Sequence, residues 1–310
     1  MLVALRRSLY ASAPMRITRL TDVEPRPRSI AVGEFDGVHL GHRQVIRGND
    51  TVLTFEPHPL RVVRPQAAPR LLTSLEVKAE LIERLGVSEL VVIPFDDGFA
   101  HQSPREFIDH VLVERLRATH VSVGENFRFG HRATGDPELL AADGRFEVRV
   151  VPLVEMDGEI VSSSHIRGLV LAGEVELAAR LLGAPFALRG EVVRGEKRGR
   201  KLGFPTANIV PDEELVYPGH GVYVARANED CAAVSIGVRP TFGTGRGVLV
   251  EAYLLDRDVD LYGQVLKLDF LARLRGERRF QSAQALVEQM HHDAERARDL
   301  CSKAPPGLSE

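Results

Sequence analysis

The chain has 310 residues, near the size at which one hydrophobic core tends to divide into two domains. Hydrophobic residues make up 44% and charged residues 27% of the sequence, and no apolar run reaches the length of about 18 residues that predicts a membrane span. The formal net charge of -3 excludes a broadly basic surface, so we expect neither a nucleic-acid partner nor a membrane partner. Any phosphate binding must therefore come from local loops.

The two cysteines, Cys231 and Cys301, lie far apart in the sequence and form no CxxC motif. This spacing predicts neither a disulfide framework nor a thiolate zinc site, and it fits a reducing, cytoplasmic location. The segment before Met15 lacks the apolar stretch of a signal peptide. We expect it to be a tail, and either Met1 or Met15 could be the true start.

Short apolar segments alternate with segments of helical periodicity through the first half of the chain, an order that predicts a parallel α/β sheet. Strands are expected at residues 29–32, 51–55, 89–94, 120–123 and 147–154. Helices are expected at residues 74–85 and from Ser103 to about Arg117. The second of these helices opens on a capping box, with proline at its first position.

The second half of the chain has a different pattern. Two helices broken near Gly173 are expected at residues 162–183, and from Phe186 onward strands alternate with turns rich in glycine and proline. A polar helix is expected around residues 283–300. We therefore expect one domain at residues 15–183 and a second at 184–303.

The segment GEFDGVHLGH joins the first expected strand to a helix start and carries three glycines and two histidines. Glycines let the backbone approach a nucleotide closely, and His39 and His42, three residues apart, can face the same ligand. One histidine on a loop is more often structural, but two in this glycine-rich setting indicate a nucleotide site. The candidate ATP-binding residues beside the histidines are Gly33, Phe35, Asp36, Gly37 and Gly41.

This segment resembles the HxGH signature of the nucleotidylyltransferases, in the form found in prokaryotic bifunctional riboflavin kinase/FMN adenylyltransferases. The segments TFEPHP at 54–59, VGENFRFG at 123–130 and SSSHIR at 162–167 resemble further motifs of that family, in the same order. The resemblance implies that the two histidines stabilise the phosphates of ATP. It also implies that Ser162, Ser163 and Arg167 hold the pyrophosphate.

Two of these motifs also have purely structural interpretations that involve no ligand. A serine cluster before a helix is often an ordinary N-cap. At least one of Phe127 and Phe129 is better explained as a core residue. Asn126 and Arg128 follow an expected strand, at the edge where open α/β sheets bind ligands. We take these two residues as candidates for flavin binding.

The connection behind the histidines is unusually short. Nine residues, 43–51, separate His42 from Val52, whereas a crossover between parallel strands normally needs at least about 10–12 residues with its helix. We expect the first helix to be very short or absent, where members of the family usually carry a longer one. We expect the loop chemistry to survive, but a riboflavin kinase with an impaired adenylyltransferase domain stays open as an alternative.

The segment at 190–209 packs four glycines and five basic side chains into one loop region, a pattern that predicts a phosphate cradle. The candidate phosphate-binding residues are Gly195, Arg198, Gly199 and Gly203. Thr206 and Asn208 alternate on an extended stretch, so both oxygens can face one hard cation such as Mg²⁺. This stretch resembles the PTAN motif of riboflavin kinases.

Glu251 is the only charged residue of the strand expected at 248–255, where it shares a face with Leu249 and Tyr253. An edge-strand glutamate that faces water would be the simple explanation. The resemblance to riboflavin kinases instead implies that Glu251 is the catalytic base. It also implies that this domain is a small Greek-key β-barrel.

The resemblance extends over residues 29–298 and implies two reactions that consume ATP with Mg²⁺: phosphorylation of riboflavin to FMN, then adenylylation of FMN to FAD. Ser235 and Arg257 depart from the familiar pattern and leave the flavin affinity open. A non-catalytic flavin sensor or carrier is a second alternative. A ligase like the aminoacyl-tRNA synthetases is disfavoured, because the sequence lacks a second Lys-Met-Ser-Lys-Ser signature.

Overall fold

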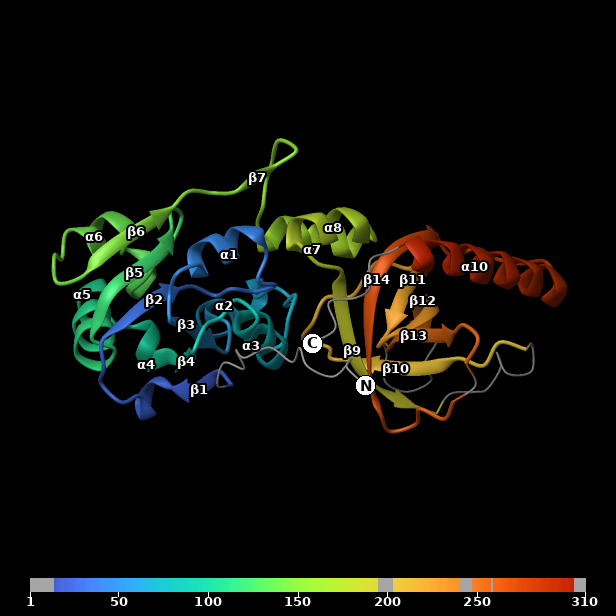
Figure 1. The fold of residues 1–310 in the computed structure, drawn as a ribbon, viewed down its shortest axis with the longest axis horizontal. Helices are drawn as coiled ribbons and strands as arrows, with labels where there is room; N and C mark the ends of the chain where they lie inside the picture. Colours follow the sequence, from blue (N-terminus) through green and yellow to red (C-terminus); the bar gives the residue numbers. More distant parts are fainter. Residues whose placement is uncertain (1–13, 195–202, 240–246, 258, 304–310) are drawn as a thin grey trace, which may run out of the picture. The chain divides into compact units, whose positions relative to one another are not determined.

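The computed structural model describes residues 14–194, 203–239, 247–257 and 259–303. The chain divides into two compact units. The first unit comprises Met1–Pro69 and Thr73–Ile160, and the second comprises Arg70–Leu72 and Val161–Glu310. In Figure 1 the first unit runs from blue to green and the second from yellow-green to red.

The first unit is built on a parallel sheet with the strand order β1-β4-β3-β2-β5-β6 (Figure 1). Its strands are β1 (Arg16–Arg19), β2 (Arg28–Val32), β3 (Thr51–Glu56), β4 (Glu89–Pro94), β5 (Ala118–Gly124) and β6 (Glu147–Val151). All neighbouring pairs are parallel. The five expected strands are confirmed, with small shifts at their ends. The edge strand β1, with the sequence RITR, lacks the apolar run that would have predicted it.

Short helices connect these strands. They are α1 (Leu40–Ile46), α2 (Pro59–Val63), α3 (Leu75–Glu83), α4 (Asp97–Ala100), α5 (Pro104–Glu106) and α6 (Pro137–Ala141). The expected helix at 74–85 is confirmed as α3, and the capping box between Ser103 and Glu106 is present at α5. Beyond α5 the chain continues as a π-helix, Phe107–Arg115, in place of the expected α-helix. The remaining elements are 3-10 turns at Leu20–Asp22, Pro65–Ala67 and His131–Ala133, and a small hairpin of β7 (Glu155–Met156) and β8 (Glu159–Ile160).

Side chains that alternate along the central strands separate two hydrophobic cores. In β3, Leu53 and Phe55 pack into one core and Val52 packs into the other, because successive side chains of a strand point to opposite faces. The segment Phe107–Arg115 supplies the first core and helices α1 and α3 supply the second. The sheet is thus covered on both faces, as the near-continuous apolar strands predict.

The second unit contains a closed antiparallel barrel with the order β10-β13-β12-β11-β14-β9. Its strands are β9 (Phe186–Val193), β10 (Ala207–Pro211), β11 (Gly221–Ala227), β12 (Asp230–Arg239), β13 (Gly247–Leu254) and β14 (Val265–Arg275). The long helix α10 (Ala283–Lys303) packs against β11, β12 and β14 (Figure 1). The barrel and the terminal helix confirm the expected fold class.

Two helices precede the barrel, α7 (Ser163–Ala172) and α8 (Val175–Leu182), and they break at Gly173 as expected. Gly173 has a φ of 82°, and a Cβ there would lie 2.5 Å from the hydroxyl of Tyr223, so glycine is required. The sequence placed the domain boundary at residue 183, whereas the compact units divide after Ile160. Helix α8 belongs to the second unit because it packs on β9 and β14. The periodicity of a helix does not specify which strands it packs against.

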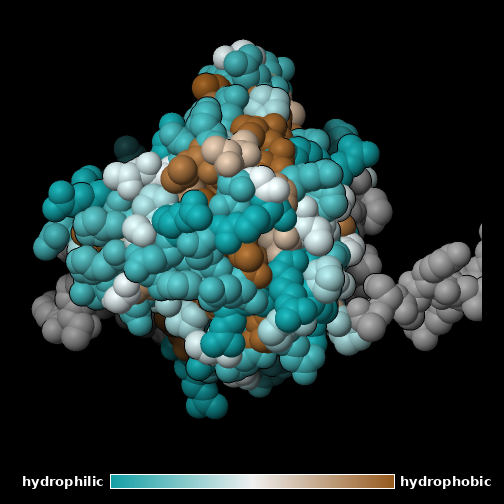
Figure 2. Space-filling view, turned by 90° about the vertical axis from the view of Figure 1, so that its left-hand side faces the viewer, coloured by the Kyte–Doolittle hydropathy of each residue, from teal (hydrophilic) through white to brown (hydrophobic). Residues whose placement is uncertain are grey.

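No helix among the described residues is long and apolar enough to cross a membrane. The face drawn in Figure 2 is mainly hydrophilic, with one larger hydrophobic patch in the upper part of the view and smaller ones elsewhere. Some exposed apolar surface is normal on folded proteins.

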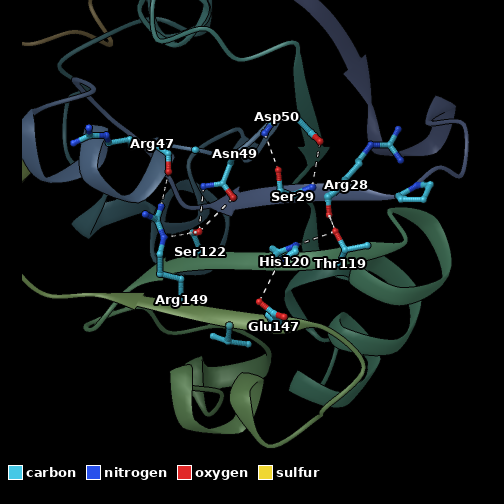
Figure 3. A pocket seen from close by; sticks show the side chains of 13 residues that line it. Arg28, Ser29, Arg47, Asn49, Asp50, Thr119, His120, Ser122, Glu147 and Arg149 are labelled. Carbon is cyan, nitrogen blue, oxygen red and sulfur yellow. Dashed lines mark hydrogen bonds and ion pairs between the residues drawn. The ribbon is translucent and has the colours of Figure 1, made fainter.

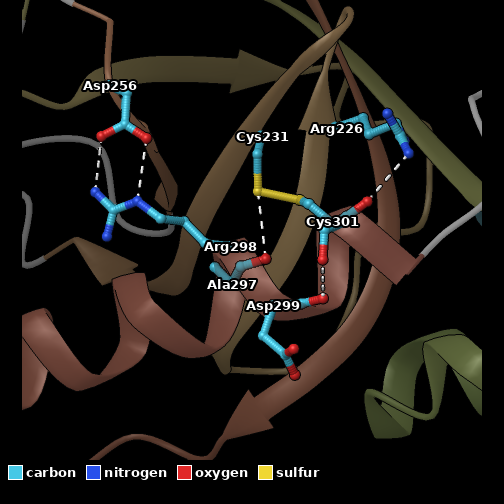
Figure 4. Close-up of a disulfide and its surroundings, with 8 residues drawn as sticks. Arg226, Cys231, Asp256, Ala297, Arg298, Asp299 and Cys301 are labelled. Atoms are coloured by element: carbon cyan, nitrogen blue, oxygen red, sulfur yellow. Dashed lines mark hydrogen bonds and ion pairs between the residues drawn. A yellow bond between two sulfur atoms is a disulfide. The ribbon is translucent and has the colours of Figure 1, made fainter.

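The cysteines form a disulfide, which overturns the expectation from their spacing. Cys231 on β12 and Cys301 on α10 are bonded, with their Cα atoms 6.1 Å apart (Figure 4). The Sγ atom of Cys231 lies 3.4 Å from the carbonyl oxygen of Ala297, and Arg226 donates to the carbonyl oxygen of Cys301 at 3.4 Å. The expectation of a reducing compartment rested on unpaired cysteines, and that premise is wrong. The two residues are 70 apart in the sequence, so only the docking of α10 on the barrel brings them together.

The double substitution C231A/C301A is expected to lower the free energy of unfolding of the barrel unit by up to about 4 kcal/mol, because the cross-link restricts the unfolded chain between the two cysteines. The measurement is urea unfolding followed by circular dichroism. C231A by itself should equal the double variant. A double variant as stable as the oxidised wild type would show that the cross-link does not stabilise the unit.

Candidate active sites

The first candidate site lies at the carboxyl edge of the parallel sheet. The loop from Gly33 to His39 follows β2, and the loop that holds Asn126 and Arg128 follows β5. Strands β2 and β5 are parallel neighbours, so both loops leave the sheet at the same edge. This is the edge at which open α/β sheets bind ligands.

Unusual backbone angles shape the loop after β2. Phe35, Gly37 and Val38 have φ values of 52°, 82° and 42°. A positive φ is strained for a β-branched residue such as Val38 and persists only where the surroundings enforce it. The Val38 amide donates to the carbonyl oxygen of Phe35 at 3.1 Å, and the Gly37 amide donates to the hydroxyl of Thr73 at 3.1 Å. The loop is therefore held in one shape.

Two residues predicted to bind ATP serve this internal architecture. Asp36 is buried, and its Oδ1 accepts a bond from the Thr73 amide at 3.1 Å. The buried ring of Phe35 lies edge-on to His42 at a centroid distance of 5.3 Å, and a Cβ on Gly33 would lie 3.0 Å from that ring. Asp36 and Phe35 thus brace the loop and the histidine beside it.

The two histidines stack at the start of α1. His39 is the N-cap of the helix, and its Nδ1 accepts a bond from the His42 amide at 3.3 Å. The two rings lie 3.5 Å apart between centroids, with an interplanar angle of 19°. The structure thus brings together the two predicted catalytic histidines, with Gly41 between them in the first turn.

Burial keeps both imidazoles neutral at physiological pH. Burial, assisted by the nearby Arg43, lowers the pKa of His39 to about 4. Burial, with smaller contributions from His39 and Lys78, holds the pKa of His42 well below the usual range for histidine. The Nδ1 atom of His42 is buried and has no hydrogen-bond partner among the described residues. The rings are therefore hydrogen-bonding groups and not fixed cations.

A buried lysine, Lys78, lies near His42 and also near Glu34. Lys78 of α3 is 3% exposed, and it acts electrostatically on both His42 and Glu34. Burial raises the pKa of Glu34 to about 8; Lys78 opposes this shift, and Asp36 adds to it. Neither Lys78 nor Thr73 was among the site residues predicted from the sequence. The signal for Lys78 was present, since a charged residue occupies the apolar face of an amphipathic helix.

The loop after β5 presents the two candidate flavin residues to solvent. Asn126 and Arg128 are exposed, and Arg128 donates to the carbonyl oxygen of Phe127 at 2.7 Å. Phe129 is buried in the core, and the ring of Phe127 stacks on it at a centroid distance of 5.6 Å. The prediction that at least one of these phenylalanines is a core residue is confirmed.

The serine motif lies in the second unit, at the start of α7. Ser162 is an N-cap whose hydroxyl accepts a bond from the His165 amide at 3.2 Å, and Ser163 is the first helical residue. Arg167, one turn later, donates through Nε to the carbonyl oxygen of Arg70 at 2.6 Å. The simple capping interpretation is therefore correct for Ser162, and an anion-binding role stays a prediction.

The second candidate site lies on the outer face of the barrel. In β13, Val250, Ala252 and Leu254 are buried inside the barrel, so the alternating Glu251 points outward and is half-buried. Asn208 of β10 lies directly opposite Glu251 in the register and is 8% exposed. Cross-strand partners of this kind share a face of the sheet. The structure thus pairs the predicted base with a predicted metal ligand.

The residues around this pair come from three elements. Ser235 of β12 lies opposite Glu251 on its other side. The buried ring of Phe204 lies 5.0 Å from the ring of Tyr253 and 4.9 Å from that of His291 on α10, between ring centroids. These contacts anchor the chain just before Thr206. They lie on the same outer face as Glu251, because Tyr253 is two residues along its strand.

The glycine-rich cradle is described only in part. Gly203 has a φ of 86°, a conformation that favours glycine. The predicted phosphate-binding residues Gly195, Arg198 and Gly199 lie outside the described residues. Among the residues that the structure does describe, no three His, Cys, Asp or Glu side chains are grouped to hold a metal ion.

Comparison with known proteins identifies both units. The model of the FAD synthetase family matches residues 21–165, and the model of the riboflavin kinase family matches residues 182–301. The chain belongs to the bifunctional riboflavin kinase/FMN adenylyltransferase family. The two sites described above lie within these two matched segments.

Bacterial members of this family align with almost the whole chain. The bifunctional riboflavin kinase/FMN adenylyltransferase of Listeria monocytogenes is 36% identical and covers 96% of this chain and 99% of its own. The enzyme of Pseudomonas fluorescens is 35% identical, with coverage of 93% and 98%. A solved structure from Streptococcus pneumoniae, described as a macrolide-efflux protein, matches with a TM-score of 0.84 and 30% identity over 92% of this chain and 99% of its own. This chain thus shares its fold with that solved structure over nearly its whole length.

The raised pKa of Glu34 gives a testable dependence of stability on pH. The folded state keeps the Glu34 proton up to about pH 8, while the unfolded chain releases it near pH 4.5. The contribution of this protonated carboxyl to the free energy of unfolding is therefore fully present below pH 4.5, and it is lost as the pH rises from 4.5 to 8. E34Q mimics the protonated carboxyl, and its stability relative to wild type should increase from pH 5 to pH 8. The measurement is urea unfolding of both proteins across that range. The exposed Glu114 supplies the control E114Q, whose difference from wild type should stay constant; the same constancy in E34Q would refute the buried, protonated state.

Proposed function

We propose that the chain phosphorylates riboflavin to FMN in its barrel unit and adenylylates FMN to FAD in its parallel-sheet unit. The observation that carries the proposal is the presence of both reactive constellations within one chain: Glu251 opposite Asn208 on the barrel, and the stacked His39 and His42 at the head of α1. Family membership supports the pairing of these two activities.

In the kinase reaction, Glu251 accepts the proton of the riboflavin 5′-hydroxyl as that oxygen attacks the γ-phosphorus of ATP, and ADP leaves. Phosphoryl transfer of this kind depends mostly on positioning and on neutralisation of charge. The outward, half-buried position of Glu251 supports the role, because a substrate can reach the carboxylate without entering the barrel core.

Thr206 and Asn208 would hold the divalent ion that accompanies ATP, and we propose that this ion is Mg²⁺. Their donors are a hydroxyl and an amide oxygen, and the Glu251 carboxylate lies next to Asn208, a set of hard oxygens that fits this cation. When bound, Mg²⁺ would neutralise the phosphate charge. Gly195, Arg198, Gly199 and Gly203 are proposed to hold the phosphates.

In the adenylyl transfer, an oxygen of the FMN phosphate attacks the α-phosphorus of a second ATP, and pyrophosphate leaves. The nucleophile is already ionised, so the reaction requires no general base. Burial lowers the pKa of both His39 and His42, and we propose that the two rings donate hydrogen bonds to the phosphates as negative charge builds. Ser162, Ser163 and Arg167 are proposed to hold the pyrophosphate, and Asn126 and Arg128 the flavin.

The formed loop argues against a kinase with a disabled second domain. The helix behind the histidines is short, as the sequence predicts, but it is present, and its N-cap and stacked rings are in place. A cytoplasmic reaction remains part of the proposal, because ATP and flavin substrates are found there. The decisive assay follows riboflavin, FMN and FAD over time with ATP and magnesium. Absence of FAD would refute the adenylyltransferase half.

Substitution E251Q is expected to lower the rate of riboflavin phosphorylation by about 10²- to 10⁴-fold, because the amide cannot accept the hydroxyl proton. FAD formation from supplied FMN should be unchanged, since that reaction uses the other unit. Chromatographic separation of flavins measures both rates. The exposed Glu229 provides the control E229Q, and kinase activity retained in E251Q would eliminate Glu251 as the base.

Substitution H39N is expected to lower FAD formation by about 10²-fold while riboflavin phosphorylation stays at the wild-type rate, because one donor to the developing charge is lost. Asparagine is a good N-cap, so α1 should keep its start. The same flavin assay measures both steps, and the exposed His110 provides the control H110N. Equal loss of both activities would indicate a folding defect in place of a catalytic role.

A further inference from the structure

A polar cavity of about 670 Å³ lies at the amino edge of the parallel sheet, opposite the edge that carries the histidines (Figure 3). Its walls are the starts of β2, β5 and β6 and the loop after α1. In that loop, Arg47 and Asn49 line the cavity, and Arg149 lines it from β6. The cavity therefore borders the place where α1 ends after only seven residues.

Arg149 reaches from β6 to the carbonyl end of α1 (Figure 3). Its Nη2 donates to the carbonyl oxygens of Gln44, Val45 and Arg47 at 3.2, 2.9 and 2.7 Å. Its Nε donates to the hydroxyl of Ser122 on β5 at 3.1 Å. One guanidinium thus links β5, β6 and the last turn of the helix.

Asn49 completes the same network from the helix side. Its side-chain nitrogen, Nδ2, donates to the carbonyl oxygens of Val45 and Ile46 at 3.0 and 3.2 Å, and to the Ser122 hydroxyl at 3.1 Å. Asn49 is 9% exposed and Ser122 is 3% exposed, so this part of the network is shielded from water. Val45 and Ile46 are buried against the sheet on the same turn.

These bonds compensate for two sources of instability in a short helix, which are its unpaired terminal carbonyl groups and its small number of residues. The last four carbonyl groups of any α-helix lack partners within the helix, and the helix dipole makes that end negative. A seven-residue helix is also too short to be stable by itself in water. The Arg149 guanidinium supplies both donors and positive charge at that end.

The other end of the same helix carries the reactive groups. His42 precedes Arg47 by five residues, which corresponds to about 7.5 Å along a helix axis. The histidines thus lie little more than one helical turn from the carbonyl end of α1. Rotation or fraying of the last turn would therefore change the orientation of their rings.

We propose that Arg149 is a positioning residue for adenylyl transfer: it clamps the carbonyl end of α1 to the sheet and so sets the orientation of His39 and His42. This inference rests on the proposed function of the histidines. Arg149 lines the cavity at the opposite edge of the sheet, so its contribution acts through α1.

The test is R149M in the full-length protein, with kcat and KM for FAD formation from FMN and ATP. Loss of hydrogen bonds to a charged group should lower kcat by about tenfold while KM for ATP changes less than about twofold. R149K, which keeps the charge and one donor direction, should recover part of kcat. The kinase rate of the other unit should be unchanged.

Arg47 offers a matched control. The side chain of Arg47 is exposed and lines the same cavity. The bonds to the helix carbonyls come from the side chain of Arg149, so R47M leaves them in place. R47M should therefore keep the wild-type kcat. S122A, which removes the partner of the Arg149 Nε while retaining the charge, should lower kcat in the same direction as R149M by a smaller factor.

Amide hydrogen exchange of the peptide that spans residues 40–47 gives a readout independent of activity. Faster exchange in R149M, but not in R47M, supports the clamp. Wild-type kcat in R149M, or unchanged exchange of α1, would overturn it, as would equal loss of kinase and adenylyltransferase rates. Failure of the wild type to form FAD would instead refute the proposed function, and the exchange result would still decide whether Arg149 holds the helix.

Discussion

The adenylyltransferase unit depends on a helix that cannot form by itself. Helix α1 has seven residues, fewer than an isolated helix needs in water, yet it carries both histidines in and just before its first turn. Its stability must come from tertiary contacts: Val45 and Ile46 buried against the sheet, and the carbonyl end held by Arg149. The geometry of the nucleotide loop is thus a property of the whole unit.

The two candidate sites position their proposed reactive groups in different ways. In the sheet unit, burial makes His39 and His42 neutral and stacks them, so the environment selects their protonation state. On the barrel, Glu251 keeps an outward position because alternate residues of β13 fill the core. Antiparallel pairing then sets Asn208 beside it. Electrostatics dominates the first site and strand register the second.

The sequence predicted most elements that have a strong local signal. Apolar strands bounded by turns, the capping box at Ser103 and the break at Gly173 depend on neighbouring residues, and each is confirmed. Strand β1 and the disulfide between Cys231 and Cys301 were missed, because one lacks an apolar run and the other joins residues 70 apart. The packing of α8 on β9 and β14 could not be predicted, because periodicity reveals an apolar face and not its partner.

The sequence by itself determined the motifs of the two candidate sites, the parallel sheet and the short crossover behind the histidines, since each is written in residue types at close spacing. Only the tertiary structure decided that Phe35 and Asp36 brace the loop, that the buried Lys78 acts on His42 and on Glu34, and that Arg149 caps α1. These features depend on burial and on contacts between residues distant in the chain. Burial and long-range contact arise only when the sheet assembles.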